Sequence, residues 1–334
     1  MHHFAKSGEV RKRIGIAGLT LIAISLIVLV NGGSVGYWTA FWWMLPVAFG
    51  LSLVTNTVGI SGAALLVPFL ILIFPFFADP VTNLESVKVG LITESFGLLS
   101  SAVAFLVFGL VDIKIALRTV LIALPFLVAG TVLTAFIPET ILLFMIAGVL
   151  FVAVFFFLFE ERFRAHRREE QAAGHVDWSH AEDTNGTLVE KHTRDGRAYH
   201  YCRSRSGYLK RFGGYSVGAF FQGAVGFGIG ELGIIAMIAS HIPIRIAIGT
   251  SHLVVAMTAI IASGLHLTFA SQGHSSSNIV PWNMVVMTIP AVILAGQISP
   301  FVASQLSTKI LERLIAGLFV LIAGALVVLA VTGE

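Results

Sequence analysis

Long apolar runs dominate the chain, and short polar segments separate them. Seven runs reach the roughly 20 residues that a helix needs to cross the hydrocarbon core of a bilayer. They are Ile14–Val30, Val87–Gly109, Ile113–Phe136, Ile141–Phe159, Ile246–Phe269, Met284–Ser304 and Ile310–Val331. Two further apolar stretches, Tyr37–Phe77 and Gly213–Ile242, carry glycine and polar residues near their middles. The pattern predicts seven spans and two interrupted hairpins or, with the same sidedness, nine spans with two short pairs.

Composition agrees with the pattern of runs. Hydrophobic residues make up 56% of the 334 positions and charged residues 12%, against about 25% charged in an ordinary globular domain. These values exclude a soluble enzyme and a disordered chain, and the net charge of +3 is too small to indicate a nucleic-acid partner. Cys202 is the single cysteine, so no intramolecular disulfide is required. We expect an all-α polytopic membrane protein without a cofactor.

A polar segment, Glu160 to Arg211, lies between the two halves of the chain. Its sequence has little apolar periodicity, and we expect a solvated loop. His175, His180, His192, His200 and Cys202 occur in it, but their spacings match no zinc pattern, so we expect no metal site.

Lysine and arginine indicate the orientation. If each interrupted stretch enters the membrane and returns to its own side, every Lys and Arg except Lys88 falls on one side. The positive-inside rule makes that side cytoplasmic. We therefore expect an inner-membrane protein with its N-terminus and the 160–211 loop in the cytoplasm and its C-terminus outside. Trp38, Trp42, Trp43 and Trp282 then lie near the outer interface.

The same topology predicts an internal repeat of inverted orientation. Each half contains one broken, re-entrant hairpin followed by three spans, and one extra N-terminal span precedes them. The expected divisions are 1–36 for the N-terminus and first span, 37–159 for repeat 1, 160–211 for the loop and 212–334 for repeat 2. Inverted repeats with broken helices are typical of secondary transporters, whose site lies at the midplane between the repeats.

The two breaks are the candidate substrate site. A backbone break at membrane depth is tolerated only where protein or a polar cavity surrounds it, and a helix that begins there directs free N–H groups and a positive dipole end at a ligand. We expect a small anion at the polar residues and glycines of the breaks and of one later segment. These residues are Asn56, Thr57, Gly59, Ser61, Gly62, Gln222, Gly226, Gly228, Gly230, Thr250 and Ser251. The competing interpretation is that the glycines serve close helix packing.

Three ionisable residues inside apolar segments are candidates for proton coupling, because such residues are costly at depth. Glu94 and His252 occupy mirrored positions in corresponding spans, and Glu231 directly follows the second glycine break. The alternative is that each is satisfied by neighbouring polar groups. His266 is interpreted as an interface residue near the outer end of its span.

The glycine segments also carry a family resemblance. The segment Gly59-Ile60-Ser61-Gly62 with Leu65-Leu66-Val67-Pro68, and the segment Gly226-Phe227-Gly228-Ile229-Gly230, resemble the glycine signature of the TauE/SafE family. Ile248-Gly249-Thr250-Ser251 is similar to its Val-Gly-Thr-Ser segment. The resemblance covers both repeats, roughly Leu45 to Val331, and implies a permease that exports small sulfur-containing anions such as sulfite or organosulfonates.

Two other functions fit parts of the sequence. A passive anion channel can also be built from paired re-entrant hairpins. Gly59-Ile60-Ser61-Gly62 fits the Gly-x-Ser-Gly pattern of rhomboid intramembrane proteases, with Ser61 as nucleophile and His252 as base. The identity of the anion, the ion coupling and the formation of a homodimer are left open by the sequence.

Overall fold

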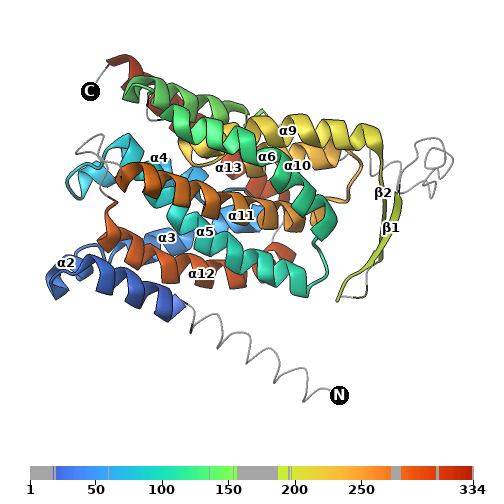
Figure 1. The fold of residues 1–334 in the computed structure, drawn as a ribbon, viewed down its shortest axis with the longest axis horizontal. Coiled ribbons are helices and arrows are strands. Elements are labelled where there is room, and N and C mark those ends of the chain that lie inside the picture. The colour runs from blue at the N-terminus through green and yellow to red at the C-terminus, as the bar shows by residue number, and fades with distance from the viewer. Residues whose placement is uncertain are drawn as a thin grey trace.

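Helices that run side by side along the long axis make up most of the protein (Figure 1). The structure is a computed structural model that describes residues 18, 20–58, 60–134, 136–152, 154–155, 187–194, 196, 198–271, 280–305 and 308–332. The predicted first span and the 160–211 loop therefore lie partly outside the described residues, as does the N-terminus. Five described stretches are long and apolar enough to cross a membrane: Val35–Thr57, Asn83–Val107, Ile113–Thr134, Arg245–Thr268 and Trp282–Ser299.

The first half contains a helix at Thr20–Asn31 and another at Glu139–Val152. Between them lie α2 (Val35–Thr39), α3 (Met44–Val58), α4 (Ala63–Leu72), the 3-10 helix η1 (Phe74–Phe76), α5 (Asn83–Val107) and α6 (Ile113–Thr134). The second half contains α9 (Arg205–Val225), α10 (Ile229–Ala239), α11 (Ile244–Ser271), α12 (Trp282–Gln305) and α13 (Thr308–Thr332). The expectation of an all-α polytopic membrane protein is confirmed.

Helices of the two halves interleave. α5 lies against α11, while α3 packs on α12 and α9 packs on α6. α4 contacts α5, and α10 contacts α11. If α3, α4, α5 and α6 are exchanged with α9, α10, α11 and α12, the same pairs are obtained. Two structurally related halves would give this result. The inverted repeat and the four sequence divisions remain predictions, and the exchange of packing partners supports the repeat.

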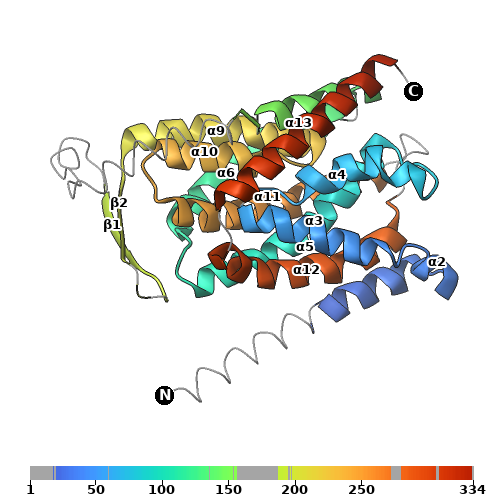
Figure 2. The same cartoon turned by 180° about the vertical axis from the view of Figure 1, so that it is seen from behind.

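Two ends of the bundle can be distinguished (Figures 1 and 2). One end carries a strand pair, β1 (Thr187–His192) and β2 (Ala198–Arg203), which pair antiparallel with Thr187 opposite Arg203. The other end carries α2 and the end of α13. Trp43 stacks there on Phe74 at 5.6 Å between ring centroids. We call these ends the hairpin end and the aromatic end.

The β-hairpin corrects one expectation. Residues 187–192 and 198–203 form paired strands that dock on the bundle, whereas the sequence predicts a solvated loop, and Tyr201 is only 4% exposed. Helix α9 also begins at Arg205, inside the predicted loop. The strands escape notice because half of their side chains are polar, and polar and apolar side chains do not alternate strictly along either strand.

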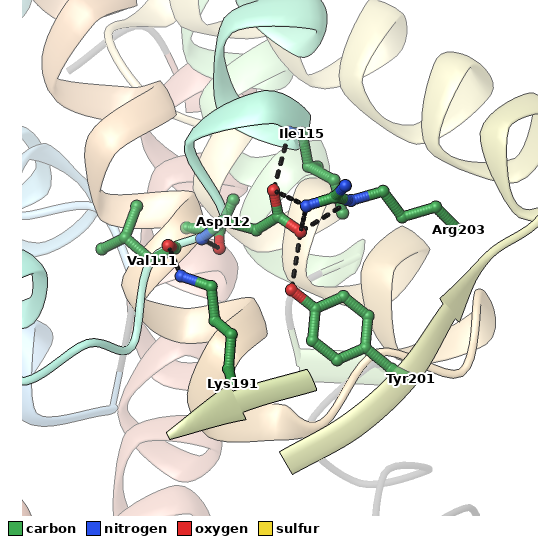
Figure 3. Close-up of polar contacts among 7 residues, drawn as sticks. Val111, Asp112, Ile115, Lys191, Tyr201 and Arg203 are labelled. Carbon is green, nitrogen blue, oxygen red and sulfur yellow. Dashed lines mark hydrogen bonds and ion pairs between the residues drawn. The ribbon is translucent and has the colours of Figure 1, made fainter. Parts of the chain in front are cut away.

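Asp112 anchors the hairpin to the turn between α5 and α6 (Figure 3). Its carboxylate accepts hydrogen bonds from the Tyr201 hydroxyl at 2.6 Å and from the Arg203 guanidinium at 2.7–2.9 Å. It also caps α6 by accepting from the Ile115 amide at 3.1 Å, and Lys191 donates to the Val111 carbonyl. Burial raises the pKa of Asp112, but these hydrogen bonds outweigh it and hold that pKa below its usual value.

Candidate functional site

The first break separates α3 from α4. The Ile60 amide donates to the Thr55 carbonyl at 3.1 Å, which closes the end of α3. Gly62 is the N-cap of α4 and Ala63 its first residue, whereas Gly59 lies outside the described residues. Ile60, Ser61 and Ala63 are buried. The N-terminus of α4, with its amides and its positive dipole end, therefore lies in the interior of the bundle.

The second break separates α9 from α10. The Gly226 amide donates to the Gln222 carbonyl at 3.0 Å, and Gly226 adopts φ +92°. Gly228 adopts φ +126°, and α10 begins at Ile229. Backbone of this kind is strained for any residue with a Cβ, so these two glycines are required by the turn itself. The N-terminus of α10 is buried as well.

The two breaks meet at one carboxylate. Glu231, in the first turn of α10, accepts from the amide of Gly228 at 3.0 Å through Oε2 and from the amide of Ser61 at 3.0 Å through Oε1. The Ser61 hydroxyl donates to Oε1 of Glu94 on α5 at 2.5 Å. All three side chains are at most 3% exposed. The prediction that both breaks come together is thus matched by direct contacts between the two hairpins.

Other glycines serve helix packing, the competing interpretation of the sequence. A Cβ on Gly223 of α9 would lie 2.2 Å from the Leu127 carbonyl oxygen of α6, and one on Gly130 of α6 would lie 2.0 Å from the Phe220 carbonyl oxygen. Gly230 lies at the second break and also allows close packing, because a Cβ there would lie 3.3 Å from Val255 and 3.6 Å from the Ser61 amide nitrogen. The glycine signature therefore combines turn formation with close packing.

Asn56 and Thr57 fold back onto α3. The Asn56 amide donates to the Ser52 hydroxyl at 3.0 Å, and the Thr57 hydroxyl donates to the Leu53 carbonyl at 2.6 Å. Asn56 also lines a cavity of about 10 Å³ together with Thr93 and Glu94. That volume is close to the minimum that a single water needs. The centre is therefore closed around these side chains in the present conformation.

Gln222 and Ser251 lie beside the second break. The Gln222 carbonyl oxygen accepts from the Thr258 hydroxyl of α11 at 2.7 Å. Its Nε2 is buried, and no partner for it occurs among the described residues. Ser251 of α11 donates to the Gly230 carbonyl at 3.4 Å. Both residues therefore remain in the candidate site, and Gln222 holds an unused donor there.

Thr250 and His252 lie apart from the contact between the breaks. The Thr250 hydroxyl accepts from the Asp112 amide at 2.9 Å and so belongs to the α5–α6 turn at the hairpin end. His252 has Nδ1 2.8 Å from the Ile248 carbonyl oxygen, and its ring stacks on Phe105 at 4.8 Å. Thr250 thus has a structural contact, and the observed contacts of His252 link it to neither break.

Sequence reasoning missed two buried residues near the second break. Lys88, the one cation that the charge count leaves on the outer side, is 2% exposed on α5, and a Cβ on Gly226 would lie 3.4 Å from Cγ1 of its neighbour Val87. His266, interpreted as an interface residue, is 5% exposed and has Nε2 2.9 Å from the Gly223 carbonyl oxygen. Both lie within predicted apolar runs, and an ionisable residue at such a place is itself a signal of function.

These features define a class of protein: an all-helical membrane protein with broken helices and a buried polar centre. A family model described as sulfite exporter TauE/SafE matches residues 44–326. The chain therefore belongs to the TauE/SafE family, as the glycine segments indicate. Comparisons with curated proteins and with solved structures gave no match.

Membership establishes the general activity. The chain is a membrane transporter of the sulfite-exporter type and handles a small anion within a lipid bilayer, and it is not an enzyme. The protease alternative is wrong on this ground. The geometry agrees, because the Ser61 hydroxyl donates to Glu94, whereas His252 stacks on Phe105.

Proposed function

We propose that the chain exports sulfite or a small organosulfonate and that the two helix breaks hold this anion. One observation carries the proposal: backbone amides from both breaks, those of Ser61 and Gly228, converge on a single carboxylate, Glu231. Helix N-termini bind sulfate, phosphate and carboxylate through the same amides and dipole. The Glu231 carboxylate occupies the place that a substrate anion requires.

Competition for these amides supplies a mechanism for coupling. An ionised Glu231 and a substrate anion repel each other in a medium of low dielectric constant, so the two cannot share the amides. A proton on Glu231 removes its charge and weakens its hold on the Ser61 amide. Glu94, which is joined to Glu231 through Ser61, is the neighbouring proton acceptor. Anion binding is thereby linked to proton occupancy of this pair.

Two further side chains complete the proposed site. The Gln222 amide provides the donor described above, and Lys88 supplies a buried positive charge close to the second break. A doubly charged sulfite in an apolar interior needs such a charge to offset its lost hydration. Asn56, at the small cavity beside Glu94, would turn towards the anion once the centre opens.

The direction follows from orientation and potential. We propose that the hairpin end faces the cytoplasm, because the described Lys and Arg of the start of α6, of β2 and of the start of α9 gather there. A membrane potential that is negative inside contributes about 2.3 kcal/mol per charge per 100 mV to the outward movement of an anion.

Sulfite flux in proteoliposomes tests the proposal. We expect labelled sulfite to enter with saturating kinetics, and taurine, sulfoacetate or sulfate to compete to different degrees. A flux that rises linearly with concentration and resists competition would instead indicate a passive anion channel. An absence of both flux and competition would refute the sulfur-anion assignment.

A further inference from the structure

A second polar cavity lies at the hairpin end, separate from the breaks. It has a volume of about 290 Å³ and is enclosed by the start of α6, the β-hairpin and the first turns of α9. This volume is at the lower end of the range for small-molecule sites. The cavity lies between two helices that also contact each other through Gly130 and Gly223 further along the bundle.

Cations line this cavity. Lys114 and Arg118 come from α6, Arg203 from β2, and Arg205 and Arg211 from α9. No carboxylate occurs among the described residues that line it. Asp112 neutralises Arg203 from outside the lining through a 2.7 Å ion pair. The described lining holds no counter-charge for the other four cations, although Asp112 also attracts Arg211 from outside it. Like charges around one cavity repel each other unless an anion is present.

Arg211 distinguishes the cavity from an ordinary basic surface. Its side chain is 6% exposed, and its Nη1 is buried without a hydrogen-bond partner among the residues that the structure describes. A buried guanidinium nitrogen in this state costs free energy unless a ligand accepts its hydrogen. Arginine is the side chain best suited to an oxyanion, because its planar fork can donate two parallel hydrogen bonds.

The cavity leads towards the centre. Tyr215, one turn beyond Arg211 on α9, lines the cavity and is fully buried. Its ring packs directly on Gly233 of α10, where a Cβ would lie 2.2 Å from the Tyr215 Cε1. Glu231 lies two residues earlier on α10. One aromatic ring therefore separates the basic cavity from the helix that carries the central carboxylate.

We propose that this cavity is an access site that binds the sulfur oxyanion from the hairpin side before it passes to the breaks, with Arg211 as its principal ligand. The proposal rests on the proposed function for the identity of the anion. The site gathers anions through its charge, and Tyr215 forms the barrier between it and α10. A cluster of one sign of charge in a low-dielectric cleft raises the local concentration of the opposite ion.

The test compares Arg211→Gln with Arg211→Lys, and Lys210→Gln is the matched control. Lys210 is the adjacent cation on α9, is exposed and does not line the cavity. The initial rate of sulfite flux is measured from each face of the membrane in oriented vesicles. For Arg211→Gln we expect the KM for sulfite at the hairpin face to rise about tenfold or more, and the KM at the other face to stay unchanged. Arg211→Lys should recover part of the loss, and Lys210→Gln should match the wild type.

Equilibrium binding of labelled sulfite to the full-length purified protein separates this inference from the proposed function. If the protein binds sulfite in an Arg211-dependent manner but does not transport it, the cavity is an anion site and the transport proposal is refuted. If Arg211→Gln transports sulfite with an unchanged KM at the hairpin face, or with an equal change in KM at both faces, the proposed access site is wrong. Addition of phosphatidylglycerol tests a lipid phosphate as the occupant. If this lipid blocks sulfite binding in an Arg211-dependent manner and sulfite cannot displace it, the inference is wrong.

Discussion

Ser61 joins the two carboxyl groups at the centre of the protein, the amide to Glu231 and the hydroxyl to Glu94. Each group of Ser61 has one proton to donate, and both are in use. A substrate that takes the Ser61 amide must therefore displace Glu231. At the residue scale, Glu231 already occupies the proposed anion site. A change in Glu231, rather than in the glycines, therefore controls access to that site.

Gln222→Ala tests the unused donor at this centre. Loss of a buried hydrogen bond to a charged ligand costs about 1.5–3 kcal/mol, so we expect the KM for sulfite to rise by roughly one to two orders of magnitude. Gln297→Ala on α12 is the matched control, since its amide donates to the Ser100 carbonyl at 2.8 Å, away from the breaks. An unchanged KM in a folded Gln222→Ala protein would remove Gln222 from the site.

At the scale of elements, both hairpins depend on backbone turns inside the bundle. The sequence predicts these breaks, because glycine and polar residues lie near the middles of two long apolar stretches, Tyr37–Phe77 and Gly213–Ile242. It does not predict that Glu231 bridges the breaks, which requires the three-dimensional approach of α10 to Ser61. For Thr250, the family-like segment indicates a place at the breaks, whereas the contact in the structure is with the Asp112 amide of the α5–α6 turn.

Gly228→Ala tests the second turn. Positive φ is unfavourable for alanine by about 1–2 kcal/mol, and the new Cβ would lie 3.0 Å from Phe221 Cβ. We expect a lower Tm for the purified protein and weaker transport. Gly213→Ala on α9 is the control, since it meets no atom within 4 Å among the described residues and favours the helix. Equal Tm values for the two variants would contradict the role of Gly228 in this turn.

The docking of the β-hairpin depends on Asp112. Because its pKa is lowered in the folded state, the stabilisation is fully present above the unfolded value near 3.9 and is lost as pH falls through the folded value. We therefore expect docking to be constant from about pH 5 to 8 and to weaken below about pH 4.

Limited proteolysis of the hairpin measures this dependence. Asp112→Asn leaves Arg203 without its buried partner, which costs about 3 kcal/mol, and should expose the hairpin at neutral pH. Glu190→Gln breaks only the exposed pair with His192 on the same hairpin and should have little effect. Similar cleavage rates in the two variants would show that the Asp112 cluster does not hold the hairpin.

At the scale of the whole molecule, the two ends of the bundle differ in the side chains that they carry. The hairpin end gathers cations and the basic cavity, and the aromatic end gathers the tryptophan and phenylalanine rings of α2, α3 and η1. Charge along the sequence is sufficient to predict this division. It does not predict the burial of Lys88, because a cation near the end of a span can face either the interface or the interior, and only packing decides between them.

Cysteine labelling tests the orientation. In a Cys202→Ser background, Leu188→Cys on the exposed face of β1 and Asp79→Cys between η1 and α5 mark opposite ends. An impermeant maleimide should label Asp79→Cys in intact cells, and Leu188→Cys only after permeabilisation. The reverse pattern would invert the proposed topology and with it the direction of export.

The central claim is that a proton on Glu231 exchanges with a substrate anion at the two breaks. The most direct measurement is sulfite flux in proteoliposomes across a range of pH, with and without an imposed pH gradient, for the wild type and Glu231→Gln. We predict that the wild-type flux saturates and follows the gradient, whereas Glu231→Gln, which cannot carry the charge, gives a flux that is insensitive to pH. A Glu231→Gln protein with the wild-type pH profile and the same response to the gradient would contradict the claim.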